Sequence, residues 1–109
     1  MIFESDLLIE QGRIAKIDPT IGPKNGNVII IDAEGKYLLP GIIDDQVHFR
    51  EPGLTHKGAT YSESRAAVAG GITSYMEHPN TKPAATTIED SHKKHTRASQ
   101  SSFANYTTN

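Results

Sequence analysis

Residues 44–53 read Asp44-Asp45-Gln46-Val47-His48-Phe49-Arg50-Glu51-Pro52-Gly53. In an extended backbone, successive side chains point to opposite faces. The predicted polar face carries Asp44, Gln46, His48 and Arg50, and the predicted apolar face carries Ile43, Val47 and Phe49. Polar groups in register at the end of an apolar strand, followed by a Pro-Gly loop, are typical of a metal-dependent site at the C-terminal mouth of a β/α barrel. The alternative is an amphipathic edge strand whose polar face meets water.

The residues after this stretch predict one βαβ unit. Thr60 and Glu63 form a capping-box pattern, an alanine-rich run follows, and Gly70 is a natural helix stop. Residues 72–77 then read as a second strand, parallel to the first. Asn80, which follows that strand, would lie at the same mouth as the polar stretch. The alternative reading of Asn80 is a turn residue next to proline.

The first 39 residues predict a small β unit. Residues 6–17 read as a hairpin that turns at Gln11-Gly12. Strands are also predicted at 28–31 and 37–39, on either side of a turn. Domain boundaries are therefore expected at 1–39 for this β unit and at 40–109 for the βαβ part.

The last part of the chain is polar. Thr87 begins a second capping pattern, but residues 91–99 have almost no apolar stripe, so a helix there is predicted to bury nothing. His92 and His95 are spaced as an i, i+3 metal pair, and a solvated face explains the same run equally well. No third barrel strand is visible after Ser99.

The composition is that of an ordinary soluble globular domain. The 109 residues include 36% hydrophobic and 22% charged residues, with a net charge of -2. This balance predicts no attraction to nucleic acid. The sequence has no cysteine, which excludes a disulfide framework and a thiolate metal site. No apolar run approaches 18 residues, so neither membrane insertion nor secretion is indicated, and a cytoplasmic location is expected.

Four motifs stand in a fixed order along the chain. They are Pro40-Gly41-Ile42-Ile43-Asp44, the run from Val47 to Gly53, Gly70-Gly71-Ile72-Thr73-Ser74 and Pro79-Asn80-Thr81-Lys82-Pro83. Together they resemble the amino-terminal part of a dihydroorotase of the amidohydrolase superfamily. The resemblance implies an α/β chain with a partial amidohydrolase fold. This is the start of a (β/α)8 TIM barrel, preceded by part of a small β-sandwich domain.

The resemblance also implies roles for five residues. His48 matches the second histidine of a zinc-binding pair, and Gln46 stands in place of the first. An amide oxygen is a weaker and harder zinc ligand than imidazole, so this departure bears on zinc occupancy. Arg50 and Asn80 match the arginine and asparagine that hold the free carboxylate of the substrate. Asp44 is expected to orient the metal ligands from outside the coordination shell.

The implied activity is the reversible interconversion of dihydroorotate and N-carbamoyl-L-aspartate in pyrimidine biosynthesis. A β/α barrel needs roughly 250 residues, so the chain is expected to be a fragment of a cytoplasmic, zinc-dependent enzyme that can be a homo-oligomer. In the family the general base and the other metal ligands come from later strands, so no catalytic residue is expected within this fragment. The small-molecule substrate is the expected partner, with no nucleic acid and no membrane.

The alternative is a noncatalytic dihydroorotase-like protein, kept as a structural partner or as a degenerate product. Gln46 favours this alternative, as does His78, which stands where the family usually has methionine. We expect His78 to be a loop or core substitution rather than a new ligand. Arg50 and Asn80 favour the enzyme, because a scaffold has no need of a carboxylate grip.

Overall fold

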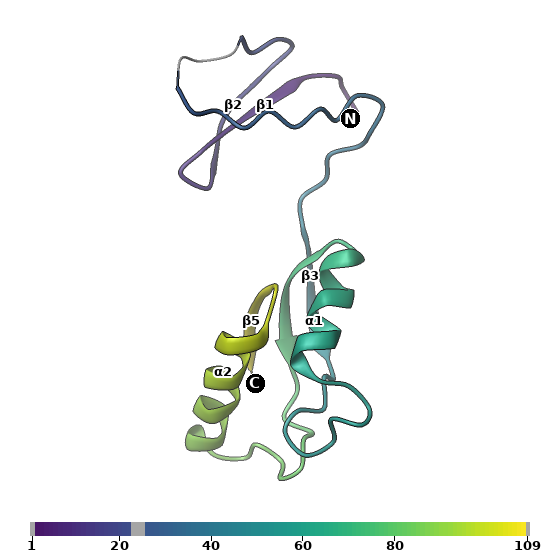
Figure 1. The fold of residues 1–109 in the computed structure, drawn as a ribbon, viewed down its shortest axis with the longest axis vertical. Helices are drawn as coiled ribbons and strands as arrows, with labels where there is room; N and C mark the ends of the chain where they lie inside the picture. Colours follow the sequence, from purple (N-terminus) through teal and green to yellow (C-terminus); the bar gives the residue numbers. More distant parts are fainter. Residues whose placement is uncertain (1, 23–25, 109) are drawn as a thin grey trace. The chain divides into compact units, whose positions relative to one another are not determined.

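The computed structural model describes residues 2–22 and 26–108 and separates the chain into two units (Figure 1). Unit 1 comprises residues 1–37 and unit 2 comprises residues 38–109. The division lies close to the sequence boundary expected between residues 39 and 40. That unit 1 belongs to a β-sandwich stays a prediction.

Unit 1 is organised around one hairpin. Strands β1 (Asp6–Glu10) and β2 (Arg13–Asp18) pair antiparallel, as the sequence predicts. The turn between them places Gln11 at φ 50° and Gly12 at φ 72°. Two successive residues in the left-handed region suit a tight hairpin, and glycine adopts that region at little cost.

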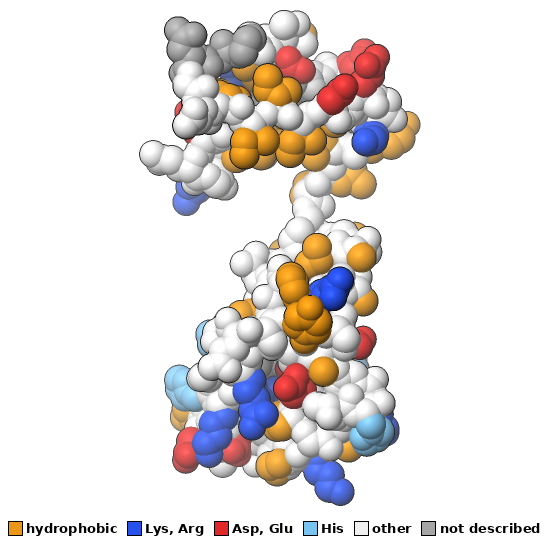
Figure 2. All heavy atoms as spheres, in the orientation of Figure 1, with side chains coloured by type: hydrophobic (Ala, Val, Ile, Leu, Met, Phe, Trp, Pro, Cys, Tyr) orange, Lys and Arg blue, Asp and Glu red, His pale blue; other side chains and the backbone are white. Residues whose placement is uncertain are grey.

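The strands predicted at 28–31 and 37–39 are wrong. The structure leaves both stretches outside any strand, although the turn between them forms, with the Lys36 N–H donating to the Ala33 carbonyl at 2.9 Å. Ile29 is 88% exposed. A strand needs a neighbour to satisfy its backbone groups, and no strand of the described residues pairs with either stretch. Hydrophobic side chains consequently gather on the surface of unit 1 (Figure 2).

Unit 2 is a βαβαβ arrangement. Strands β3 (Ile42–Val47), β4 (Ile72–Glu77) and β5 (Asn105–Thr108) form a parallel sheet in the order β3-β4-β5. Helix α1 (Thr60–Ala69) connects β3 to β4, and helix α2 (Ile88–Ser101) connects β4 to β5 (Figure 1). The predicted βαβ unit is therefore present, with a further helix and strand. Within the described residues, no helix is long and apolar enough to cross a membrane.

Helix α1 begins slightly differently from the prediction. Thr60 is its first helical residue, and Ala59 precedes it with an extended backbone. The Ala59 N–H donates to the Ser62 hydroxyl at 3.3 Å, so Ser62 takes the place expected of Glu63. The helix ends at Gly70, as predicted.

Helix α2 begins after Thr87, as predicted, and the Thr87 hydroxyl accepts a hydrogen bond from the Asp90 N–H at 3.1 Å. The prediction that this helix buries nothing is wrong. Lys94 and Ala98 are both buried, one turn apart on the face toward the sheet. The charge of a buried lysine needs a partner, and the partner of Lys94 is Glu77, at the end of β4.

The sequence predicts no third barrel strand, and β5 corrects that prediction. Tyrosine and threonine favour strands, but four residues are too few for the pattern to stand out. Strand β5 forms because its backbone pairs with β4, and Tyr106 lies opposite Tyr75 in this register.

The core of unit 2 lies between the sheet and the helices. Val47, Phe49, Ala67 and Tyr75 form a buried cluster, in which the rings of Phe49 and Tyr75 are 4.6 Å apart. The Tyr75 hydroxyl donates to the Ser102 hydroxyl at 2.9 Å, just beyond α2. The core therefore fixes the helices against the strands whose ends carry the candidate site.

Candidate functional site

The candidate site lies where β3 and β4 end. Val47 pairs with Glu77 in the parallel register, and the His78 N–H donates to the Val47 carbonyl at 3.0 Å. Parallel strands end at the same edge of a sheet, so the loops at 48–59 and 78–87 leave that edge together. This edge is where ligands bind in α/β folds.

Strand β3 is shorter and less regular than predicted. It ends at Val47, and its register with β4 shifts between Asp44, which lies opposite Tyr75, and Val47, which lies opposite Glu77. Three steps along β3 therefore match two steps along β4, which is the geometry of a β-bulge. An extra residue reverses the facing of the side chains beyond it.

The predicted alternation holds after the bulge and fails before it. Val47 and Phe49 are buried, while His48 between them is exposed. Ile43, predicted to share their face, is instead 74% exposed and lines a shallow hollow together with Asp45. The prediction of a single unbroken polar face from Asp44 onward is therefore wrong.

The Asp44 side chain bonds to the backbone of its own strand. Its carboxylate accepts a hydrogen bond from the Gln46 N–H at 3.1 Å, which holds the backbone at the bulge. The Gln46 side chain is exposed. The role of Asp44 in orienting metal ligands stays a prediction.

Arg50 has an unusual backbone. Its φ of 68° lies in the left-handed region, which costs a side-chain-bearing residue about 1 to 2 kcal/mol. The turn that follows is closed by the Leu54 N–H, which donates to the Arg50 carbonyl at 3.0 Å. Strained positions of this kind cluster at functional sites. The half-buried Arg50 is thus set at the start of the β3–α1 loop at an energetic cost.

The two loops are joined directly. The Lys82 N–H donates to the Pro52 carbonyl at 3.0 Å. Gly53 has a φ of 86°, and a Cβ atom there would overlap the Lys82 carbonyl. The loop that carries Arg50 and the loop that carries the exposed Asn80 are therefore held against each other.

Glu51 ties the first loop to its helix. Its carboxylate accepts a hydrogen bond from the Thr60 N–H at 2.8 Å. A negative charge is favourable at a helix N-terminus, where backbone N–H groups lack partners. The start of α1 is thus fixed by a residue next to Arg50.

His48 lies beside His78. Their rings stack with centroids 5.1 Å apart and an interplanar angle of 23°. The sequence gives no reason to pair them, because His78 reads as a loop or core substitution. The described residues contain no group of three or more His, Cys, Asp or Glu side chains that could hold a metal ion. His48 and His78 by themselves supply too few ligands for a tetrahedral zinc site.

A buried ion pair lies behind this edge. The Lys94 ammonium is 3.5 Å from the Glu77 carboxylate and donates a hydrogen bond to the His78 carbonyl at 2.9 Å. Burial raises the pKa of the Glu77 carboxyl, and the charge of Lys94 opposes that rise. The other Glu77 oxygen, Oε1, is buried without a hydrogen-bond partner among the described residues. The sequence carried one signal that Glu77 is buried. Side chains two residues apart along a strand point to the same face, and Tyr75, two residues before Glu77, is buried.

Comparison with known proteins places these features in a family. The dihydro-orotase-like family model matches residues 35–107. A dihydroorotase from Carboxydothermus hydrogenoformans is 50% identical over 82 residues, which cover 75% of this chain and 19% of that protein. A dihydroorotase from Sulfurihydrogenibium sp. is 52% identical over 79 residues, covering 72% and 18%. The chain thus spans about a fifth of the length of these relatives.

A solved structure extends the likeness to the fold. L-Hydantoinase (dihydropyrimidinase) from Arthrobacter aurescens matches with a TM-score of 0.80 at 30% identity, covering 95% of this chain and 23% of that one. The expected α/β class and partial amidohydrolase fold are confirmed. Because the family model matches most of the chain, at residues 35–107, the chain belongs to the dihydroorotase-like family.

Proposed function

We propose that this segment works within a longer chain, the whole protein, which interconverts dihydroorotate and N-carbamoyl-L-aspartate. The named dihydroorotases at about half identity support this reaction class. The fold neighbour is named a hydantoinase, so the fold leaves the type of cyclic amide open. The contact between the two loops supports dihydroorotate, because one loop carries the Arg50 cation, the other carries the Asn80 amide, and both leave the sheet at the edge where α/β folds bind ligands.

In this proposal Arg50 and Asn80 bind the free carboxylate of the substrate. The guanidinium presents two parallel N–H donors, which match the two oxygens of a carboxylate, and the Asn80 amide adds a further donor. The strained backbone of Arg50 and the contact between the loops support pre-organisation of this grip. The substrate would then be oriented before its ring amide is attacked.

Zinc enters the proposal only for the whole protein. His48 would be one ligand, and the exposed Gln46 is proposed beside it as a weaker one. The residues of this segment do not complete the coordination shell. Asp44 is proposed to support these ligands. We also propose that the whole protein is cytoplasmic and that its partner is the small-molecule substrate.

A second candidate function is a noncatalytic structural partner. Gln46 favours it, because the amide at this position lacks the strong zinc-binding donor of imidazole. The two candidates differ in whether the whole protein turns over substrate.

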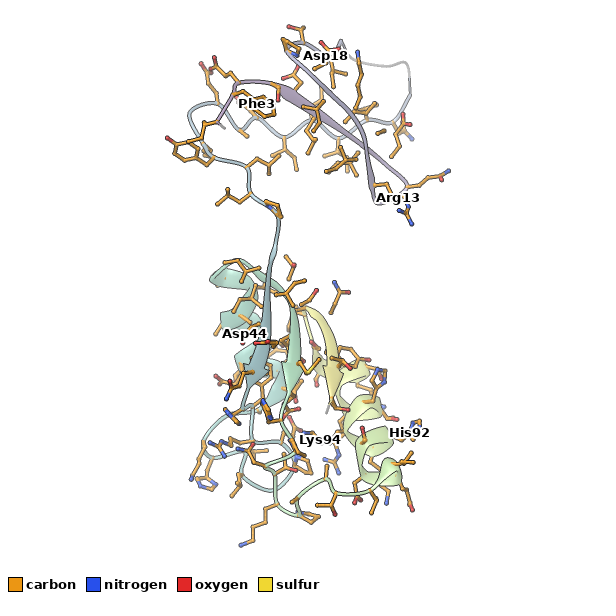
Figure 3. All side chains as sticks on the ribbon, turned by 180° about the vertical axis from the view of Figure 1, so that it is seen from behind. Phe3, Arg13, Asp18, Asp44, His92 and Lys94 are labelled. Carbon is orange, nitrogen blue, oxygen red and sulfur yellow. The ribbon has the colours of Figure 1, made fainter. Side chains whose placement is uncertain are left out.

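The direct test is an assay of the whole protein with dihydroorotate and with a hydantoin that lacks a free carboxylate. We expect dihydroorotate to react with a kcat/KM at least about tenfold higher, since one charge-assisted contact is worth about 1.5 to 3 kcal/mol. His48→Ala should abolish turnover, and His92→Ala, on the outer side of α2, should not (Figure 3). No turnover of either substrate would favour the structural partner.

The contact between the loops gives a prediction on stability. Gly53→Ala in the whole protein should lower the free energy of unfolding by about 2 to 3 kcal/mol, through left-handed strain and loss of the hydrogen bond between Lys82 and Pro52. It should also raise KM for dihydroorotate, because the loops separate. Chemical denaturation and steady-state kinetics measure the two effects.

Gly71→Ala is the matched control. Gly71 has a φ of 90°, close to that of Gly53, but a Cβ there meets no atom within 4 Å. This variant should lose only about 1 to 2 kcal/mol from strain and leave KM unchanged. Equal effects of the two substitutions on KM would show that the loop contact has no part in substrate binding.

A further inference from the structure

Lys94 is an unusual residue for its helix. It belongs to a polar run, yet its side chain is only 3% exposed, and that of its partner Glu77 is 5% exposed. Taking two charges out of water is costly, and the attraction between them often fails to repay the cost. Stability alone is therefore a poor explanation for this pair. Its position suggests a role at the candidate site instead.

The pair lies directly behind the candidate site. Lys94 extends from α2 toward the carboxyl ends of the strands, whereas His92 on the same helix points outward (Figure 3). The Lys94 ammonium donates to the His78 carbonyl at 2.9 Å, and His78 is the first residue beyond β4. That carbonyl marks the point where the chain leaves the sheet to form the loop that carries Asn80.

The next residue offers no alternative donor. Pro79 lacks an N–H group, so the peptide after His78 cannot be fixed by donation from its own nitrogen. The Pro79 carbonyl accepts hydrogen bonds from Thr81 at 2.9 Å and Ala85 at 3.1 Å, which fold the loop onto itself. Those bonds shape the loop internally. The bond from Lys94 connects its first residue to α2.

We propose that Lys94 is a positioning residue, which through the His78 carbonyl fixes the start of the β4–α2 loop and thereby the placement of the Asn80 amide. Glu77 holds the ammonium group in line with that carbonyl. This inference rests on the proposed function, in which Asn80 binds the carboxylate of dihydroorotate. Lys94 touches no substrate itself and acts only through the loop.

The test compares two variants of the whole protein. Lys94→Met breaks the pair and leaves the Glu77 charge buried and unpaired, so it should lower the melting temperature and raise KM. Glu77→Met combined with Lys94→Met removes both charges and fills the space with apolar atoms. This double variant should recover the melting temperature of the original protein, while KM for dihydroorotate stays about tenfold raised and kcat changes less than about threefold.

Lys93→Met is the control on the same helix. Lys93 forms an exposed pair with Glu89 at 2.8 Å, one turn away along α2. Its removal should change neither the melting temperature nor KM. If the Met variants do not fold, Glu77→Gln with Lys94→Gln replaces them, since the shorter neutral amide cannot reach the carbonyl.

Recovery of both the melting temperature and the original KM in the double variant would overturn the proposal, because Lys94 would then serve packing alone. Failure of the proposed function has a different signature, which is no turnover by the unsubstituted protein. Amide hydrogen exchange of residues 80–82 then decides: faster exchange in the double variant supports the positioning role, and unchanged exchange overturns it.

Discussion

Heated by itself, the 109-residue chain should lose its structure gradually, without one cooperative transition. The buried hydrophobic residues of the described part are Val47, Phe49, Ala67, Tyr75 and Ala98. Burying a large apolar side chain contributes about 1.5 to 3 kcal/mol, whereas fixing each residue of backbone costs about 1 to 2 kcal/mol. A core of two aromatic rings, a valine and two alanines cannot offset the ordering of this many residues.

Calorimetry and circular dichroism measure this directly. The expected trace is broad, with a calorimetric enthalpy that does not match the van't Hoff enthalpy, and the whole protein is the control, for which a sharp transition is expected. A single sharp, concentration-independent transition of the monomeric segment would contradict the prediction. It would show that the segment is a stable domain in its own right.

Arg50→Lys in the whole protein should lower kcat/KM for dihydroorotate by roughly one to two orders of magnitude. Lysine keeps the charge but loses the planar pair of donors that fits a carboxylate, and a charge-assisted contact is worth about 1.5 to 3 kcal/mol. The backbone at this position has a φ of 68° with either residue, so the strain largely cancels in the comparison. Steady-state kinetics at matched pH measures the loss.

The choice of substrate separates two roles for Arg50. A hydantoin without a carboxylate should be affected much less by Arg50→Lys, because it makes no contact for the substitution to remove. Arg97→Lys, at an exposed position of α2, should leave both substrates unaffected. If Arg50→Lys slows both substrates equally, Arg50 serves the structure of the loop and the carboxylate grip is lost from the proposal.

The elements that the sequence predicts well are those with local signals. Residues 72–77 form β4 with the predicted bounds, because the glycines at 70 and 71 and the alternating side chains mark both its start and its period. The hairpin at Gln11-Gly12 is equally local. Each of these features can be read within one turn or one strand.

The elements that the sequence mispredicts depend on distant partners. Residues 28–31 have the composition of a strand, but no neighbouring strand in the described residues pairs with them. Strand β5 has a weak local pattern and forms because β4 offers it a ladder. The bulge in β3 has no compositional signal, and it changes which side chains share a face.

The same distinction applies to the candidate site. His48, Arg50 and Asn80 stand out because they follow strands that the sequence predicts, so their common edge is predictable. The pair of Glu77 and Lys94 is separated by a whole loop and half a helix, and a lysine in a polar run reads as solvated. Only the packing of α2 against the sheet brings these two residues together.

The unpaired stretch at 28–31 also affects how the polypeptide behaves in a crowded solution. It consists of four β-branched residues in a row, the side chains most at home in a cross-β stack. No strand of the described residues pairs with it, and beyond the Val28 N–H, which donates to the Gly26 carbonyl at 3.0 Å, its backbone can serve as a template for an identical stretch of another molecule. Asp32 follows at once and acts as a charged gatekeeper at one end only. To stay in solution, the protein therefore needs another segment or a partner to pack over this stretch. Without one, self-assembly into fibrils is the competing outcome.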